Sequence, residues 1–185
     1  MSRPASQTGT REQILRVARD LIQTRSYLGF SYQDIADQVG IRKASLYHHF
    51  PTKERLGVEV MRAAMQAFKG WSGALPGTPQ DKLAAYFGMY RKALRAGQGV
   101  CPAGAMAPGW DCIDDDLRQA VREMRSAQLL WLAGVLGALR GKAAAATTPA
   151  ALFAACQGAL ISARMSGHGA DFDEAVAPLK AALLG

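Results

Sequence analysis

Apolar residues recur with a helical period along nearly the whole chain. The first examples are Ile14, Leu15, Ala18, Leu21 and Ile22, which stand at positions i, i+1, i+4, i+7 and i+8. This spacing places all five side chains on one face of a helix. No stretch of useful length alternates apolar and polar residues as a half-buried strand does, and no segment repeats. We therefore predict an all-α fold.

Helix caps and turn-forming residues divide this pattern into about nine helices. Gly40 ends the second helix, and Pro51 prevents the third from continuing beyond His49. The alanine-rich run that precedes Pro149 is interpreted as a break between the last long helices. Thr10 and Asp171 are expected as N-caps because a Gln or Glu follows each three residues later. The predicted starts are Thr10, Ser31, Arg42, Thr52, Pro79, Pro102, Asp114, Pro149 and Asp171.

The composition is that of a globular protein, with 49% hydrophobic and 20% charged residues. The N-terminal segment has no apolar core of the kind found in signal peptides. The longest apolar run, residues 129–139, is shorter than the ~20 residues that a membrane-spanning helix requires. The three cysteines are too scattered for a disulfide framework and fit no zinc-site spacing. We expect a cytoplasmic protein without a membrane segment, a metal or another cofactor.

The charge is unevenly distributed. The chain carries a net charge of +7, and residues 1–69 hold 11 Lys and Arg against six Asp and Glu, a net of +5. Residues 70–185 contribute only +2. A basic excess in the first third indicates a polyanionic partner for that part of the chain.

Residues 42–49 are predicted to form the second helix of a helix-turn-helix, after the helix that begins at Ser31. With about 100° per residue, Leu46 and Phe50 fall on the inner side. Such a helix suits the major groove of DNA, where its N-terminal residues meet base edges. The outward face carries small, hydroxyl, imidazole and cationic groups, namely Arg42, Lys43, Ala44, Ser45, Tyr47 and His48.

Each of these groups has a chemistry that fits DNA. Ala44 is small enough to allow close approach and to contact a thymine methyl group. Tyr47 and His48 can donate to phosphate oxygens. Lys53, in the first turn of the next helix, adds a charge where backbone N–H groups already favour an anion. Two residues at the start of the preceding helix, Ser31 and Tyr32, complete the predicted interface.

Other interpretations of these residues stay open. Adjacent residues on a helix point about 100° apart, and no third ligand follows His48 or His49 at helical spacing, so a metal site is disfavoured. His49 fits a packing role as well as a DNA contact. Arg3 lies in a segment more typical of a disordered tail than of a DNA-binding arm.

Two segments, TREQILRVARDLI and GFSYQDIADQVGIRKASLYHHFPTKERL, resemble the TetR family of transcriptional repressors. The Tyr-x-x-Phe-x-x-Lys core of that family reads Tyr47, Phe50 and Lys53 here. The resemblance implies a DNA-binding domain over residues 1–54 and a ligand-binding and dimerisation domain over residues 55–185. Later segments, CPAGAMA, LRQAVREM and WLAGVL, are similar to the branch that responds to reactive electrophiles. Residues 25–29 depart from the usual short glycine turn, which should alter only the loop between the first two helices.

The resemblance also implies a ligand cavity among the later helices. Aromatic and methionine side chains there can simply fill a core, and Trp131 is expected to do so. Buried Tyr and Trp also supply the few polar groups that a cavity needs. Cys101 is predicted at the N-cap of a helix begun by Pro102, where the dipole favours the thiolate, so it is the redox or electrophile candidate. The predicted cavity lining consists of Phe68, Tyr86, Tyr90, Met106, Trp110 and Met124.

A single helix-turn-helix contacts one half-site, so specific binding implies a homodimer on a near-palindrome. The resemblance places the dimer interface on the last two helices, although these helices could instead pack only within one subunit. The predicted interface residues are Ala155, Gly158, Ala159, Ser162, Ala163, Val176, Leu179 and Leu183.

These features predict a ligand-responsive regulator, a repressor, that binds a double-stranded DNA operator and is released by a small-molecule inducer. In this hypothesis the ligand shifts the fourth helix and so changes the separation of the two DNA-reading helices. Two alternatives from other classes are a small helical enzyme that uses His48, His49 or Cys101, and a helical adaptor that binds protein.

Overall fold

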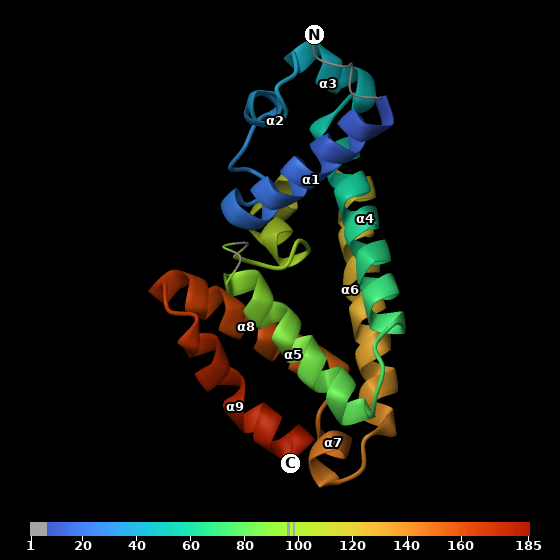
Figure 1. Cartoon of the computed structure of the whole chain (residues 1–185), viewed down its shortest axis with the longest axis vertical. Helices are drawn as coiled ribbons and strands as arrows, with labels where there is room; N and C mark the ends of the chain where they lie inside the picture. The colour runs from blue at the N-terminus through green and yellow to red at the C-terminus, as the bar shows by residue number, and fades with distance from the viewer. Residues whose placement is uncertain (1–6, 96, 98) are drawn as a thin grey trace.

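The computed structural model describes residues 7–95, 97 and 99–185, and these residues form helices without a strand (Figure 1). The prediction of an all-α fold is therefore confirmed. The elements are α1 (Gln7–Arg25), α2 (Tyr32–Val39), α3 (Lys43–His49), α4 (Lys53–Gly73), α5 (Pro79–Arg95), the 3-10 helix η1 (Gly104–Cys112), α6 (Asp115–Ala138), α7 (Lys142–Ala146), α8 (Pro149–Ser166) and α9 (Ala170–Leu184).

Helices α1, α2 and α3 occupy one end of the molecule, and the other helices extend from them. Figure 1 shows α1, α2 and α3 at the top, with α4 and α6 running side by side down the long axis. Helices α5, α8 and α9 pack on one another beside α6, and α7 lies at the far end. Because α4 packs on both α1 and α6, it connects the first three helices to the rest. The predicted boundary between residues 54 and 55 falls in its first turn.

A chain of aromatic rings runs through the core of the larger part. Phe68 on α4 lies 5.8 Å from Trp131 on α6, measured between ring centroids, and Trp131 lies 5.5 Å from Tyr86 on α5. Tyr86 contacts Tyr90 at 5.3 Å, and Tyr90 stacks on Phe172 of α9 at 5.8 Å. Aromatic pairs in these offset and edge arrangements are favourable beyond the area they bury. These ring contacts connect α4, α5, α6 and α9.

Most predicted helix caps are present. Ser31 caps α2, and its hydroxyl and backbone form a capping box with Asp34. Thr52 and Asp114 accept backbone N–H groups at the starts of α4 and α6. Gly40 ends α2 with a φ of 75°, a left-handed conformation that side chains disfavour.

Four local predictions are wrong. Thr10 lies inside α1, which begins one turn earlier at Gln7, so it does not stand at the helix start. Asp171 lies within α9, where it complements the helix dipole, and Gly169 is the N-cap. Pro102 precedes η1 and does not open an α-helix. The alanine run expected as a break forms α7, in keeping with the high helix propensity of alanine.

Candidate nucleic-acid interface and ligand cleft

The outward face of α3 is open to solvent. Leu46 and Phe50 are buried beneath the helix, with 0% and 2% of their surface exposed. Ser45 and His49 are half-buried at its edges. The predicted orientation of α3 is therefore confirmed. The exposed residues on its outer side are Arg42, Lys43, Ala44, Tyr47 and His48.

Tyr32 fixes the turn that follows α3. Its side chain is buried, and the single hydrogen of its hydroxyl is shared between the carbonyl oxygens of Phe50 at 2.8 Å and Thr52 at 2.6 Å. Burial raises the pKa of Tyr32 above its ordinary value, so the hydroxyl stays protonated. The prediction that Tyr32 contacts DNA is corrected, because its hydroxyl is occupied by the chain itself. Its ring supports Tyr47 at a centroid distance of 4.9 Å.

Lys53 is also held by its own chain. Its ammonium donates to the carbonyl oxygen of Phe30 and lies 4.2 Å and 4.7 Å from the ring centroids of Phe30 and Tyr27. Burial lowers the pKa of Lys53. The side chain was predicted as a free phosphate contact, and the structure places it as a link between α4 and the loop before α2. The Ser31 hydroxyl is similarly engaged with Asp34 at 2.6 Å.

Replacing Tyr32 with phenylalanine is expected to lower the free energy of unfolding by about 1–3 kcal/mol, because the carbonyls of Phe50 and Thr52 lose a buried donor. Urea unfolding followed by circular dichroism measures this change. Tyr47→Phe is the matched control, since that side chain is exposed, and it should change stability by less than about 0.5 kcal/mol. Equal losses in both variants would contradict the anchoring role of Tyr32.

A cleft of about 620 Å³ opens among α1, α4, α5, α6 and the segment that leads into η1. Three predicted lining residues, Phe68, Tyr90 and Met124, do line it. The other three are corrected. Tyr86 and Met106 are fully buried in the core, and Trp110 lies on η1 beneath Arg122. Sequence reasoning missed the lining residues Gln23, Trp71 and Gln128.

A neutral hydrogen-bonded chain runs from two residues of the cleft wall, Tyr90 and Gln128, into the core behind it. The Gln128 oxygen can only accept, so the Tyr86 hydroxyl donates to it at 3.4 Å. Tyr90 must then donate to Tyr86 at 3.0 Å, and Gln157 Nε2 donates to Tyr90 at 3.3 Å. Burial raises the pKa of both tyrosines, so the chain stays uncharged. The cleft therefore offers polar groups without a buried charge.

The three cysteines differ in exposure. Cys101 lines the cleft, and its sulfur lies 3.9 Å from Gln128 Nε2. It is not at a helix N-cap as predicted, because Ala103 occupies that position in η1. The dipole argument for a reactive Cys101 thiol is thereby removed. Cys112 is exposed, and Cys156 is buried, which raises the pKa of Cys156 to about 12.

Comparisons with known proteins agree on one family. The family model for bacterial regulatory proteins of the tetR family matches residues 14–60, which contain α2 and α3. A TetR-family transcriptional regulator from Agrobacterium tumefaciens superposes with a TM-score of 0.87 at 28% identity, covering 96% of this chain and 99% of that one. Residues 14–60 therefore match the DNA-binding part of the TetR family, and the whole chain has the fold of a TetR-family regulator.

Two further relatives extend this likeness. A TetR regulator from Legionella pneumophila shares the fold, with a TM-score of 0.86 at 22% identity over 99% of this chain and 100% of that one. The transcriptional repressor KstR2 of Mycolicibacterium smegmatis is 32% identical over 95 residues, 51% of this chain. The match spans 45% of that repressor, so the chain covers less than half of its length.

The loop that departs from the usual TetR-family pattern joins the two parts of the molecule. Tyr27 is buried in it and packs edge-on to Phe30 at 6.3 Å. Leu28 lies against Gly109 of η1, where a β-carbon on the glycine would come within 2.9 Å of Leu28 Cγ. The loop was expected to leave the α3 region unaffected. Its Tyr27 ring nevertheless lies under the ammonium of Lys53, the first residue of the helix that follows α3.

The last two helices of the chain present a different face from the one predicted. Ala159, Ala163, Val176 and Leu183 are buried in the subunit's own core, so their assignment as dimer contacts is corrected. Ala155 and Leu179 are half-buried, whereas Gly158 and Ser162 are exposed. The exposed stripe of α8 is rotated by about one residue and consists of Ala154, Gly158, Ile161, Ser162 and Met165.

Two general absences hold for the described part of the chain. No helix in it is long and apolar enough to cross a membrane. Within the same residues, no three His, Cys, Asp or Glu side chains gather as a metal site would require. Arg3 lies outside the described residues.

Proposed function

We propose that this chain is a transcriptional repressor that binds a palindromic DNA operator as a homodimer and is released by a small molecule. The observation that carries the proposal is the solvent-facing side of α3, with Arg42, Lys43, Ala44, Tyr47 and His48 exposed together. Cations and donors on this face suit phosphates, and the small Ala44 suits close approach to base edges. The KstR2 proteins that the chain resembles are named repressors.

The homodimer is supported by the exposed stripe of α8. Ile161 and Met165 expose 45% and 83% of their surface, and Gly158, one turn before Ile161, allows close approach of a second helix. Isologous dimers are the commonest protein assembly, and two half-sites on DNA require two reading helices. An apolar face on α8 therefore fits a second copy of this chain.

Release by a small molecule is supported by the cleft, whose walls come from α1, α4, α5 and α6. A ligand that binds better at one separation of the reading helices shifts the dimer toward it. Cys101 on the cleft wall is the group through which an electrophile would act. A catalytic role for His48 or His49 is disfavoured, because neither has an acidic partner within ion-pair distance in the described chain.

Fluorescence anisotropy with a labelled duplex from the DNA flanking the protein's own gene tests the proposal. Affinity is expected to fall by about 10³–10⁵ between 50 and 200 mM salt if six to ten phosphates are contacted. An unrelated duplex of the same length is the control for sequence preference, and it should bind more weakly at every salt concentration. A flat salt dependence, or no binding to any duplex, would contradict the proposal and favour an adaptor.

A further inference from the structure

Gln23, near the end of α1, is a buried amide with one unused group. Only 7% of its surface is exposed, and its Nε2 donates to the carbonyl oxygen of Val100 at 3.1 Å. A carbonyl only accepts, so the amide must present its nitrogen to Val100 and its oxygen elsewhere. No donor among the described residues reaches Gln23 Oε1. A buried acceptor without a donor is unfavourable, and a donor brought to it would be bound well.

Gln23 is also part of the cleft wall. Arg19, one turn earlier on α1, lines the same cleft, together with Lys92 and the apolar side chains of Phe68 and Trp71. No carboxylate is among the lining residues of the described chain. A cationic ligand would be repelled by Lys92 and by Arg19, although Arg19 is paired with Asp20 at 3.3 Å outside the cleft lining, whereas a neutral group that donates a hydrogen bond meets no such repulsion.

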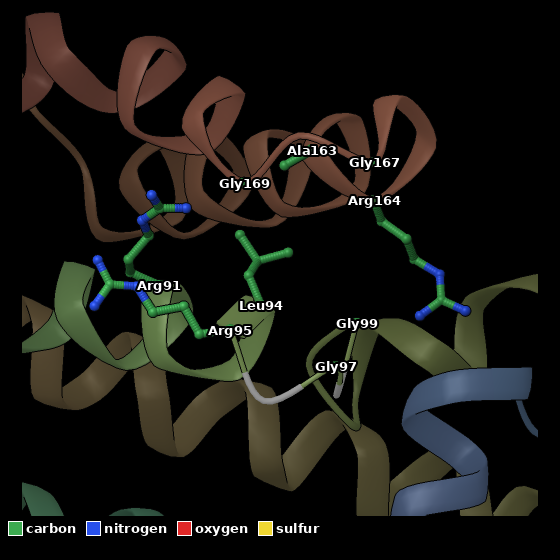
Figure 2. Close-up of a pocket in the computed structure, with 9 residues that line it drawn as sticks. All are labelled: Arg91, Leu94, Arg95, Gly97, Gly99, Ala163, Arg164, Gly167 and Gly169. Carbon is green, nitrogen blue, oxygen red and sulfur yellow. The ribbon is translucent and has the colours of Figure 1, made fainter.

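The end of α1 at Gln23 is tied to other parts of the molecule. Arg164 of α8 donates to the carbonyl oxygens of Gln23 and Thr24, and the Val100 amide donates to the Gln23 carbonyl at 3.4 Å. Figure 2 shows a separate, smaller pocket of about 360 Å³ between α5 and α8, in which the Arg164 side chain points toward α1 and away from Arg91. Helix α1 in turn packs on α2. A ligand contact at Gln23 would therefore act on α1, the helix that packs against α2 of the helix-turn-helix.

A glycine makes this junction possible. Gly99 has a φ of 59°, and a β-carbon there would lie 1.7 Å from an Arg164 guanidinium nitrogen. A side chain at residue 99 would displace the Arg164 guanidinium from this position and would be strained by the positive φ. The turn that positions the Val100 carbonyl, and hence the Gln23 amide, thus depends on Gly99.

We propose that the ligand of the cleft is an apolar, uncharged compound that carries a hydroxyl or an amide N–H, and that this group donates to Gln23 Oε1 after a rotation of the side chain that uncovers this buried oxygen. The inference rests on the proposed function, because it assumes that the cleft is the ligand site. It goes further in giving the ligand class and in placing the sensing contact on α1. The ligand's effect then passes directly along α1 to α2, in addition to any movement of α4.

Isothermal titration calorimetry on the full chain with three matched probes tests this inference. The probes are 4-pentylphenol, 4-pentylanisole, in which a methyl group replaces the donated hydrogen, and protonated 4-pentylbenzylamine. Wild-type protein is expected to bind the phenol about tenfold more tightly than the anisole, the difference that one neutral hydrogen bond makes. The cationic amine should bind more weakly than the phenol.

Two variants locate the preference. Gln23→Met keeps a side chain of similar length without the amide and should bind phenol and anisole equally. Gln119→Met makes the same chemical change on the exposed face of α6 and should retain the tenfold preference. Equal binding of phenol and anisole by the wild type, or no binding of the phenol up to its solubility, overturns the inference without any variant. A preference that survives in a folded Gln23→Met protein overturns it as well.

Duplex binding by the same wild-type preparation separates this inference from the proposed function. Salt-dependent duplex binding without a phenol preference overturns the ligand class alone. A phenol preference without duplex binding at any salt concentration overturns the proposed function and leaves the assignment of Gln23 standing. Release of the duplex by the phenol at concentrations where the anisole has no effect supports both.

Discussion

Replacing Arg42 and Lys43 together with alanine is expected to weaken binding to the operator duplex by about a hundredfold, because two cations leave the face that meets DNA. Both side chains are exposed at the start of α3, next to Ala44. The slope of log affinity against log salt should fall by about two, one for each phosphate no longer neutralised. Anisotropy titrations at several salt concentrations measure affinity and slope together. The fold should be unaffected, since neither side chain contributes to the core.

The matched control removes the same charge from the opposite end of the molecule. Arg140 and Lys142 are exposed just before α7 and at its first residue, and α7 lies at the far end from α3 in Figure 1. Their replacement by alanine lowers the net charge equally and should change affinity by less than about twofold at physiological salt, where charges more than a Debye length apart are largely screened. If both double variants weakened binding to the same extent, the cause would be net charge, and α3 would not be the reading helix.

The orientation of α3 could be predicted because it depends on local pattern alone. Leu46 and Phe50 are one helical turn apart, so burying them turns Ala44 and His48 outward whatever the rest of the chain does. The caps at Ser31 and Thr52 are equally local, since each hydroxyl accepts an N–H group three residues away. Features that depend only on residues within one or two helical turns could therefore be predicted from the sequence.

The predictions that failed depend on contacts between distant segments. From the sequence, Tyr32 at the start of a helix looks like an exposed hydroxyl. Only the folded structure brings the carbonyl oxygens of residues 50 and 52 within hydrogen-bond distance of it. Gln23 and Gln128 are polar residues on amphipathic helices, and nothing in their spacing indicates that they lie in a cleft wall. The outer face of α8 was misplaced by about one residue, because alanine and glycine fit buried and exposed positions equally well.

Replacing Phe172 with alanine is expected to destabilise the protein by about 3–5 kcal/mol, the range found for removing a fully buried phenylalanine. Its side chain is 0% exposed, and it stacks on Tyr90 with a ring angle of 20°. The substitution leaves a cavity between α9 and α5 directly behind the hydrogen-bonded wall of the cleft. For a chain of this length the melting temperature should fall by about 10 °C or more. Calorimetry and urea unfolding at a fixed protein concentration measure both quantities.

Phe153→Ala is the comparison, because that ring is half-buried on α8 beneath Arg125, whose guanidinium lies 5.7 Å from its centroid. It should cost less than half as much as Phe172→Ala, since less apolar surface is removed from the core. Because Tyr90 rests on Phe172, the Phe172 variant should also bind cleft ligands more weakly while keeping its salt-dependent duplex binding. A Phe172 variant as stable as the wild type would mean that α9 is not part of the core and that Tyr90 is held in place by its hydrogen bonds to Tyr86 and Gln157 alone.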